Sequence, residues 1–113
     1  CEVSGMDLNE KRCIPCEGGL EPLSKNEAKE FLKKIQGWKF GNKGIKIYRK
    51  FIFDDFISSL DFVNKLGALA EIEGHHPDIS FGWGYAEIFF FTHAIGGLHE
   101  NDFIMAAKTN ELI

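Results

Sequence analysis

The sequence lacks any apolar run approaching the roughly 18–20 residues that a membrane-spanning helix needs. No segment has the pattern of a secretory signal either, and we therefore expect a cytoplasmic protein. The 113 residues make one domain of ordinary size. With 44% hydrophobic and 27% charged residues, the composition excludes disordered and collagen-like classes and is typical of a globular protein.

Cysteine is scarce and confined to positions 1, 13 and 16. Cys13 and Cys16 form a CxxC pair, a spacing that occurs in redox motifs and in zinc sites. No second CxxC follows, and no strand–helix unit of the thioredoxin type begins here. We therefore expect neither function at this pair, although a zinc site completed by histidines stays an alternative.

Basic residues are outnumbered, and the net charge is −4, but they are unevenly distributed. Residues 25–50 contain nine of the thirteen lysines and arginines and only two glutamates. Most of these lysines alternate with apolar residues, which is typical of a solvated face. A nucleic-acid surface is the alternative interpretation. We favour the solvated face and expect no nucleic-acid partner.

Apolar residues at helical spacing predict three helices. The first begins at a capping box formed by Ser24 and Glu27 and runs to residue 37. The second runs from an aspartate cap at position 54 or 55 to about residue 73, and the third spans about 100–112. The apolar stripe of the second helix consists of Phe56, Leu60, Val63, Leu66, Leu69 and Ala70, and Phe62 and Ile57 widen it.

Alternating apolar and polar residues predict four strands, over residues 38–40, 45–51, 79–83 and 85–93. Within the last of these, Ile88–Phe91 is apolar on both faces, which suits a central strand or a strand at a subunit contact. The order α-β-β-α-β-β-α predicts an α+β fold, a single four-stranded antiparallel sheet with three helices packed on one face. We expect residues 24–113 to form this single domain and residues 1–23 to precede it as an extended lead.

Histidines provide the candidate functional site. His75 and His76 are adjacent at the junction of a helix end and a strand, where Pro77 stiffens the backbone. His93 is expected at the end of the fourth strand, and Asp102 in the first turn of the last helix, where a carboxylate can orient an imidazole.

Three interpretations of these histidines are open. They can lack a role, they can bind a transition metal, or they can perform metal-free acid–base catalysis near neutral pH. Adjacent histidines rarely bind one ion together, and no HExxH spacing occurs, which disfavours the metal site.

Three short motifs stand at fixed intervals along this part of the chain. They are Glu71-x-x-x-His75-His76-Pro77, Thr92-His93 and Gly97-Leu98-x-x-x-Asp102. In this order and spacing they resemble the signature of the pterin-4a-carbinolamine dehydratases, also called dimerisation cofactors of a hepatocyte nuclear factor. The similarity extends over residues 13–113. Two positions depart from the family pattern: Gly74 stands where many members have Asp or Asn, and His99 where Ser or Thr commonly caps the last helix, so we expect a weaker helix start.

The resemblance implies the fold described above and a defined activity. The reaction is loss of water from a 4a-hydroxytetrahydropterin to give a quinonoid dihydropterin, in tetrahydrobiopterin recycling, with no cofactor and no metal. It also implies a homodimer or homotetramer, with an aromatic amino-acid hydroxylase as the metabolic partner. The alternative is a non-catalytic protein-interaction module, because animal relatives also bind a transcription factor's dimerisation helices.

For the histidines, the resemblance implies that His75 and His93 form the acid–base pair and that His76 mainly positions the substrate. Asp102 would hydrogen-bond to His93 and orient it. Four other residues would support the site.

Of these four, Glu71 and Pro77 would support the pocket from the helix end and the strand start. Thr92 would offer backbone groups to the amide edge of the pterin. Trp38 would either stack against the substrate or anchor the core, and the sequence leaves both open.

Overall fold

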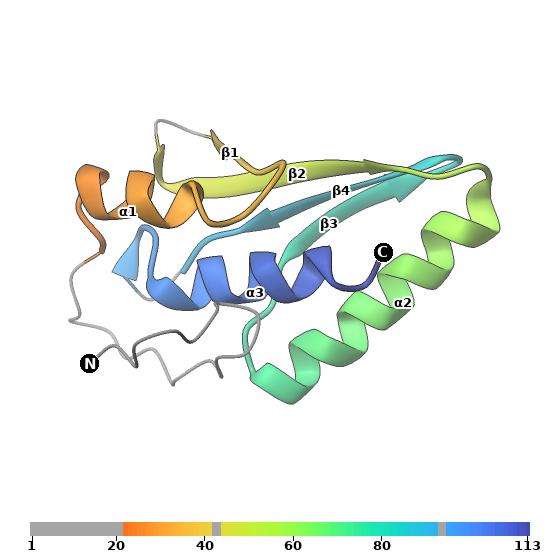
Figure 1. Cartoon of the computed structure of the whole chain (residues 1–113). Coiled ribbons are helices and arrows are strands. Elements are labelled where there is room, and N and C mark those ends of the chain that lie inside the picture. The colour runs from red at the N-terminus through yellow and green to blue at the C-terminus, as the bar shows by residue number, and fades with distance from the viewer. Residues whose placement is uncertain (1–21, 42–43, 93–94) are drawn as a thin grey trace.

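The computed structural model describes residues 22–41, 44–92 and 95–113. Its elements are, in order, α1 (Lys25–Leu32), β1 (Lys39–Gly41), β2 (Lys46–Ile52), α2 (Phe56–Glu73), β3 (Asp78–Gly82), β4 (Tyr85–Phe90) and α3 (Glu100–Asn110). The strands form one antiparallel sheet in the order β1-β2-β4-β3. The three helices lie on one face of it, with α3 between α1 and α2 (Figure 1). The predicted α+β fold is confirmed.

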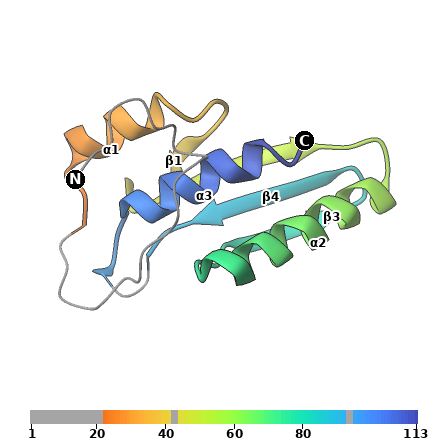
Figure 2. The same ribbon diagram turned by 60° about the horizontal axis from the view of Figure 1, so that its bottom comes forward.

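Strand β4 is central, because it pairs with β2 on one side and β3 on the other. Its alternate residues Ala86, Ile88 and Phe90 are completely buried, whereas the residues between them are only partly buried. Of the two roles expected for this apolar run, the structure therefore shows the central strand. In the view of Figure 2, the ribbon of β4 runs between those of α3 and α2.

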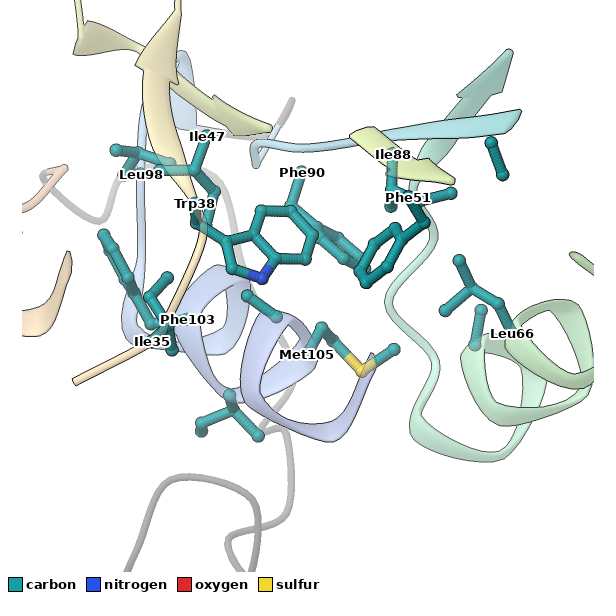
Figure 3. Close-up of a cluster of buried hydrophobic side chains, with 14 of the residues drawn as sticks. Ile35, Trp38, Ile47, Phe51, Leu66, Ile88, Phe90, Leu98, Phe103 and Met105 are labelled. Atoms are coloured by element: carbon teal, nitrogen blue, oxygen red, sulfur yellow. The ribbon is translucent and has the colours of Figure 1, made fainter. Parts of the chain in front are cut away.

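The core lies between the sheet and the helices, and aromatic side chains dominate it. Trp38 packs against Phe90 and Phe51, with ring centroids 5.8 and 6.2 Å apart. From the helix side, Phe103 and Met105 of α3 are completely buried against this group (Figure 3). Burying large aromatic side chains supplies much of the hydrophobic stabilisation of so small a domain.

Helix α1 begins as predicted and ends earlier. The capping box is present, with the Glu27 N–H donating to Ser24 Oγ (3.2 Å) and the Ser24 N–H donating to Glu27 Oε1 (2.9 Å). After Leu32 the chain continues in tighter turns, since the Ile35 N–H bonds to the carbonyl three residues back. At Gly37 the chain takes φ +90°, a conformation that favours glycine, and leaves for β1.

Helix α2 has the predicted ends, with Asp55 as its N-cap and Gly74 as its C-cap. Its buried face includes Phe62, Leu66 and Ala70 of the predicted set, whereas Phe56 and Ile57 at the start of that set are exposed, so the face lies toward the Phe62 side. The physical reason is Ser59, which is completely buried and donates its hydroxyl to the Gly82 carbonyl at the end of β3 (2.7 Å). The buried residues of α2 are Ser59, Phe62, Leu66 and Ala70.

The sheet face away from the helices carries aromatic rings and lysines. Lys46 Nζ lies 5.3 Å from the centroid of the Phe89 ring, and Lys50 Nζ lies 5.1 Å from that of Tyr85. Trp83, expected inside a strand, lies instead in the β3–β4 turn with 71% of its surface exposed. No helix in the described ranges is long and apolar enough to cross a membrane.

Candidate active site

Three segments distant in sequence meet at one end of the sheet. His75, His76 and the half-buried Pro77 directly precede β3, and Thr92 follows β4 by two residues. Because β3 and β4 are antiparallel, with Asp78 opposite Phe89, the start of one strand lies beside the end of the other. An isolated bridge between residues 92 and 97 then brings the N-terminus of α3 to the same place.

Gly74 sets the direction in which the histidine segment leaves α2. It adopts φ +69°, ψ +26°, and its N–H and that of His75 both donate to the Ala70 carbonyl (2.8 and 3.2 Å). This left-handed cap favours glycine, and Asn and Asp are the other residues that adopt it most readily. The conformation therefore explains why glycine can replace the Asp or Asn expected from the resemblance.

Asp102 is the centre of the site. Its side chain is completely buried and accepts hydrogen bonds at both oxygens. Oδ1 lies 2.7 Å from Nε2 of His75, and Oδ2 accepts from the Thr92 hydroxyl (2.8 Å) and from the backbone N–H of His99 (2.9 Å). A buried carboxylate is stable only where such donors surround it.

His75 is held firmly by this carboxylate. Its side chain is 11% exposed, and its ring stacks on Phe90, with centroids 6.2 Å apart and planes inclined by 13°. An ionised carboxylate can only accept, so Nε2 must carry the shared proton. The side-chain hydrogen bond of His75 to the described residues uses Nε2, and Nδ1 has no partner among them, which leaves Nδ1 for chemistry.

His76 lies in a different environment from its neighbour. Its side chain is 57% exposed, and its Nε2 lies 2.5 Å from Oε2 of Glu71, which is itself exposed. The two adjacent imidazoles thus have separate carboxylate partners, one buried and one in solvent. An exposed pair of this kind contributes little to stability, and its effect is to orient the His76 ring.

Asp102 has a different described partner from the one expected. The resemblance assigned it to His93, which lies outside the described residues, whereas the structure joins it to His75. The sequence could not distinguish the two histidines. His75 precedes one predicted strand and His93 ends the next, and antiparallel pairing puts both positions at the same end of the sheet.

Thr92 also has a different role from the expected one. Its backbone N–H donates to the Gly97 carbonyl (2.9 Å), and its own carbonyl accepts from the N–H groups of Gly97 and Ile95 (3.4 and 3.3 Å). The backbone of Thr92 is therefore engaged in the bridge, and its hydroxyl donates to Asp102.

His99 caps α3 instead of weakening its start. Nδ1 of His99 accepts from the Asn101 N–H (3.0 Å), while the His99 N–H donates to Asp102. The sequence analysis missed this contribution. The signal was available in the acidic residue three positions after the cap, which is the second half of a capping box.

Trp38 is a core anchor. It is buried, and its indole Nε1 donates to Oδ1 of Asn110 at the end of α3 (2.9 Å). It reaches the site only indirectly, because Phe90 contacts both Trp38 and His75.

In the described part of the chain, no group of three or more His, Cys, Asp or Glu residues is arranged to hold a metal ion. Cys13, Cys16 and His93 lie outside these ranges. The zinc alternative for the CxxC pair is therefore not tested by the structure.

Comparison with known proteins agrees with the motif resemblance. A family model described as Pterin 4 alpha carbinolamine dehydratase matches residues 21–112. A relative from Methylococcus capsulatus is 51% identical over 110 residues, covering 97% of this chain and 96% of its own length. One from Azoarcus is 50% identical over 106 residues, covering 94% of this chain and 91% of its own length. Both are provisionally named pterin-4-alpha-carbinolamine dehydratases.

Two solved structures are also similar. A transcriptional coactivator/pterin dehydratase from Brucella melitensis superposes with a TM-score of 0.77 at 29% identity, covering 81% of this chain and 98% of the other. A pterin dehydratase-like protein that is a RuBisCO assembly factor in the alpha-carboxysome gives a TM-score of 0.59 at 27% identity, covering 68% and 89%. The same fold is thus found in proteins with different described roles.

Proposed function

Because the chain belongs to the pterin-4-alpha-carbinolamine dehydratase family, we propose that it removes water from a 4a-hydroxytetrahydropterin to give a quinonoid dihydropterin. The observation that carries the proposal is His75, held by the buried Asp102 through Nε2 and left with Nδ1 for proton exchange. Imidazole changes protonation near neutral pH, which suits it to this work.

The reaction needs an acid and a base. The C4a hydroxyl leaves as water once an acid has protonated it, because hydroxide is a poor leaving group. The lone pair of N5 forms the new C4a–N5 double bond, and a base removes the N5 proton. No electrons are transferred to or from the substrate, so the balance requires no redox cofactor.

We assign the acid–base pair to His75 and His93 and substrate positioning to His76. His75 is the best supported of the three, since Asp102 orients its ring through the hydrogen bond to Nε2. His76 is supported by its exposure and by its contact with Glu71, which holds its ring at the surface where a substrate can reach it. With acids on two sides, the site would accept both stereoisomers of the carbinolamine.

The direct test is a spectroscopic dehydratase assay with carbinolamine generated enzymatically. We expect quinonoid dihydropterin to form faster than in the uncatalysed reaction, in proportion to the concentration of the protein. A rate equal to that of the buffer alone would refute the proposal. Assays with different pterin side chains and with a coupled aromatic amino-acid hydroxylase would then identify the physiological substrate and partner.

A protein-interaction role is the second candidate, and exposed apolar side chains favour it. Ile52, Ile57 and Trp83 are more than two-thirds exposed near the end of the sheet where β2 stops and β3 turns into β4. The described relatives include a coactivator/dehydratase and a RuBisCO assembly factor, which show that this fold takes protein partners elsewhere.

We propose that the chain itself covers part of this surface as a homodimer or homotetramer. Exposed sheet edges and apolar groups are a liability in a monomer, and a symmetric copy is their commonest cover. Light scattering at micromolar concentration should give at least twice the 12.8 kDa chain mass. Trp83→Ser should shift the distribution toward smaller species, whereas a monomeric mass for the unmodified chain would contradict the proposal.

A further inference from the structure

The side-chain hydroxyl of Thr92, two residues after β4, donates to Asp102. Thr92 is a buried residue whose hydroxyl lies 2.8 Å from Oδ2 of Asp102. The same oxygen accepts the backbone N–H of His99. Oδ2 therefore accepts two hydrogen bonds, while Oδ1 contacts Nε2 of His75.

We infer that Thr92 is a positioning residue for the proposed reaction. With the His99 N–H, its hydroxyl fixes which oxygen of Asp102 faces His75. Thr92 and the His99 N–H thereby hold the carboxylate in the orientation that reaches Nε2. The carboxylate, which only accepts, keeps the proton of neutral His75 on Nε2 and leaves Nδ1 as the nitrogen that exchanges a proton with the substrate. The inference rests on the proposed function for its kinetic consequence, but the state of the imidazole can be measured without any substrate.

The two donors at Oδ2 predict the orientation of the side-chain amide in Asp102→Asn. The His99 N–H cannot turn away, because it belongs to the backbone, so the amide oxygen must occupy the Oδ2 position. The amide NH₂ then faces Nε2 of His75 and donates to it. Since Nε2 must now accept, the proton of the neutral imidazole moves to Nδ1.

The first measurement is therefore the tautomer of His75, from ¹⁵N chemical shifts of histidine-labelled protein at a pH where the imidazole is neutral. The His75 signals are assigned by their loss in His75→Gln. We expect the Nε2–H tautomer in the unmodified protein and the Nδ1–H tautomer in Asp102→Asn. Retention of Nε2–H in Asp102→Asn would overturn the inference, whether or not the protein is a dehydratase.

The second measurement isolates Thr92. Thr92→Val keeps the size of the side chain and removes the hydroxyl, so Oδ2 loses one of its two donors. We expect kcat to fall about tenfold, the effect of one charge-assisted hydrogen bond, with KM nearly unchanged. Thr92→Ser restores the donor and should return kcat to within about threefold of the original.

A matched control is available in α3. Thr109 is also completely buried, and its hydroxyl donates to the Met105 carbonyl (2.6 Å) away from Asp102. Thr109→Val should leave kcat and the His75 signals unchanged. Unchanged kcat in Thr92→Val, or an equal loss in Thr109→Val, would overturn the positioning role. Failure of the dehydratase assay alone would refute the proposed function and leave the tautomer result to decide this inference.

Discussion

The two ends of α3 each carry a polar cluster, buried at the N-terminal end and partly buried at the C-terminal end, and the two clusters differ in which atoms they leave without a partner. At the N-terminal end, Asp102 collects donors from Thr92, His99 and His75. His75 still has a second ring nitrogen with no partner among the described residues. We refer to these four residues as the N-terminal cluster.

At the C-terminal end, Asn110 is the centre. Its Oδ1 accepts from the indole of Trp38 (2.9 Å) and the guanidinium of Arg49 (2.7 Å), and its Nδ2 donates to the Gln36 carbonyl (3.1 Å). Arg49 also bonds to this carbonyl and lies 4.4 Å over the Phe51 ring. Gln36, Trp38, Arg49 and Asn110 form the C-terminal cluster.

In the C-terminal cluster, the guanidinium of Arg49 packs closely against the backbone at Gly37. A Cβ added to Gly37 would lie 2.7 Å from Nε of Arg49, so a side chain at this position would displace the guanidinium. Burial lowers the pKa of Arg49 from its ordinary value, because desolvation disfavours the charged form. An arginine nevertheless stays charged near neutral pH and cannot exchange protons with a substrate there.

The difference separates a cluster that stabilises from one that can catalyse. Both satisfy their buried polar atoms, and both tie α3 to distant segments. Only the N-terminal cluster ends in an imidazole, a group that can act as acid or base, and this imidazole has a second nitrogen with no partner among the described residues. The N-terminal cluster is therefore the better candidate for catalysis, because its buried polar atoms are hydrogen-bonded while Nδ1 of His75 has no partner among the described residues.

The largest expected effect is on His75. His75→Ala removes the reactive imidazole and should lower the dehydration rate at least about tenfold and as much as 10⁴-fold, the usual range for an acid–base group. His93→Ala should do the same. Circular dichroism should show a retained fold, with His99→Ser as a control that removes another histidine beside Asp102. Wild-type activity in the double variant His75→Ala/His93→Ala would place the chemistry elsewhere.

Asn110→Ala should have the second largest effect, and on stability rather than rate. It leaves the buried indole N–H of Trp38 without its acceptor, and we expect the free energy of unfolding to fall by about 2 kcal/mol. Urea denaturation measures this directly. Asn110→Asp keeps the acceptor oxygen and should lose less. A loss of kcat as large as that of His75→Ala would break the distinction between the two clusters.

His99→Ala should have a smaller effect. It removes the imidazole acceptor that caps α3, at a cost of about 1 kcal/mol in stability, as for other N-caps. It keeps the backbone N–H that Asp102 needs, so kcat should stay within about threefold. His99→Ser restores a capping oxygen and should recover the stability. A collapse of kcat in His99→Ala with intact fold would show that the side chain takes part in the reaction.

The smallest expected effect is that of chelation. Because an imidazole can protonate a leaving hydroxyl, activity should persist in EDTA, and Cys13→Ser with Cys16→Ser should leave turnover nearly intact. The dehydratase assay before and after dialysis against EDTA measures this. Loss of activity that zinc restores would contradict metal-free catalysis by the N-terminal cluster.

Local sequence signals determined most of the element boundaries. The Ser24–Glu27 capping box, the Asp55 cap and Gly74 act over a few residues of backbone, so their effect can be read without knowing the fold. The two-sided apolar run was compatible with a central strand, but the strand order β1-β2-β4-β3 required the structure. The histidine motif by itself indicated the family.

Only the tertiary structure decided which side chains meet. Sequence placed Asp102 near an imidazole, but its contact with His75 depends on the register of β3 and β4 and on the bridge at Thr92, both of which are long-range. The same holds for α2, whose buried face follows the Ser59–Gly82 hydrogen bond rather than its most apolar stripe. From the sequence, Trp38 can either stack against a substrate or pack in the core. The hydrogen bond from its indole to Asn110, seventy-two residues away, shows the second role. A capping interaction depends on neighbours in sequence, whereas a buried network depends on which neighbours the whole fold brings together.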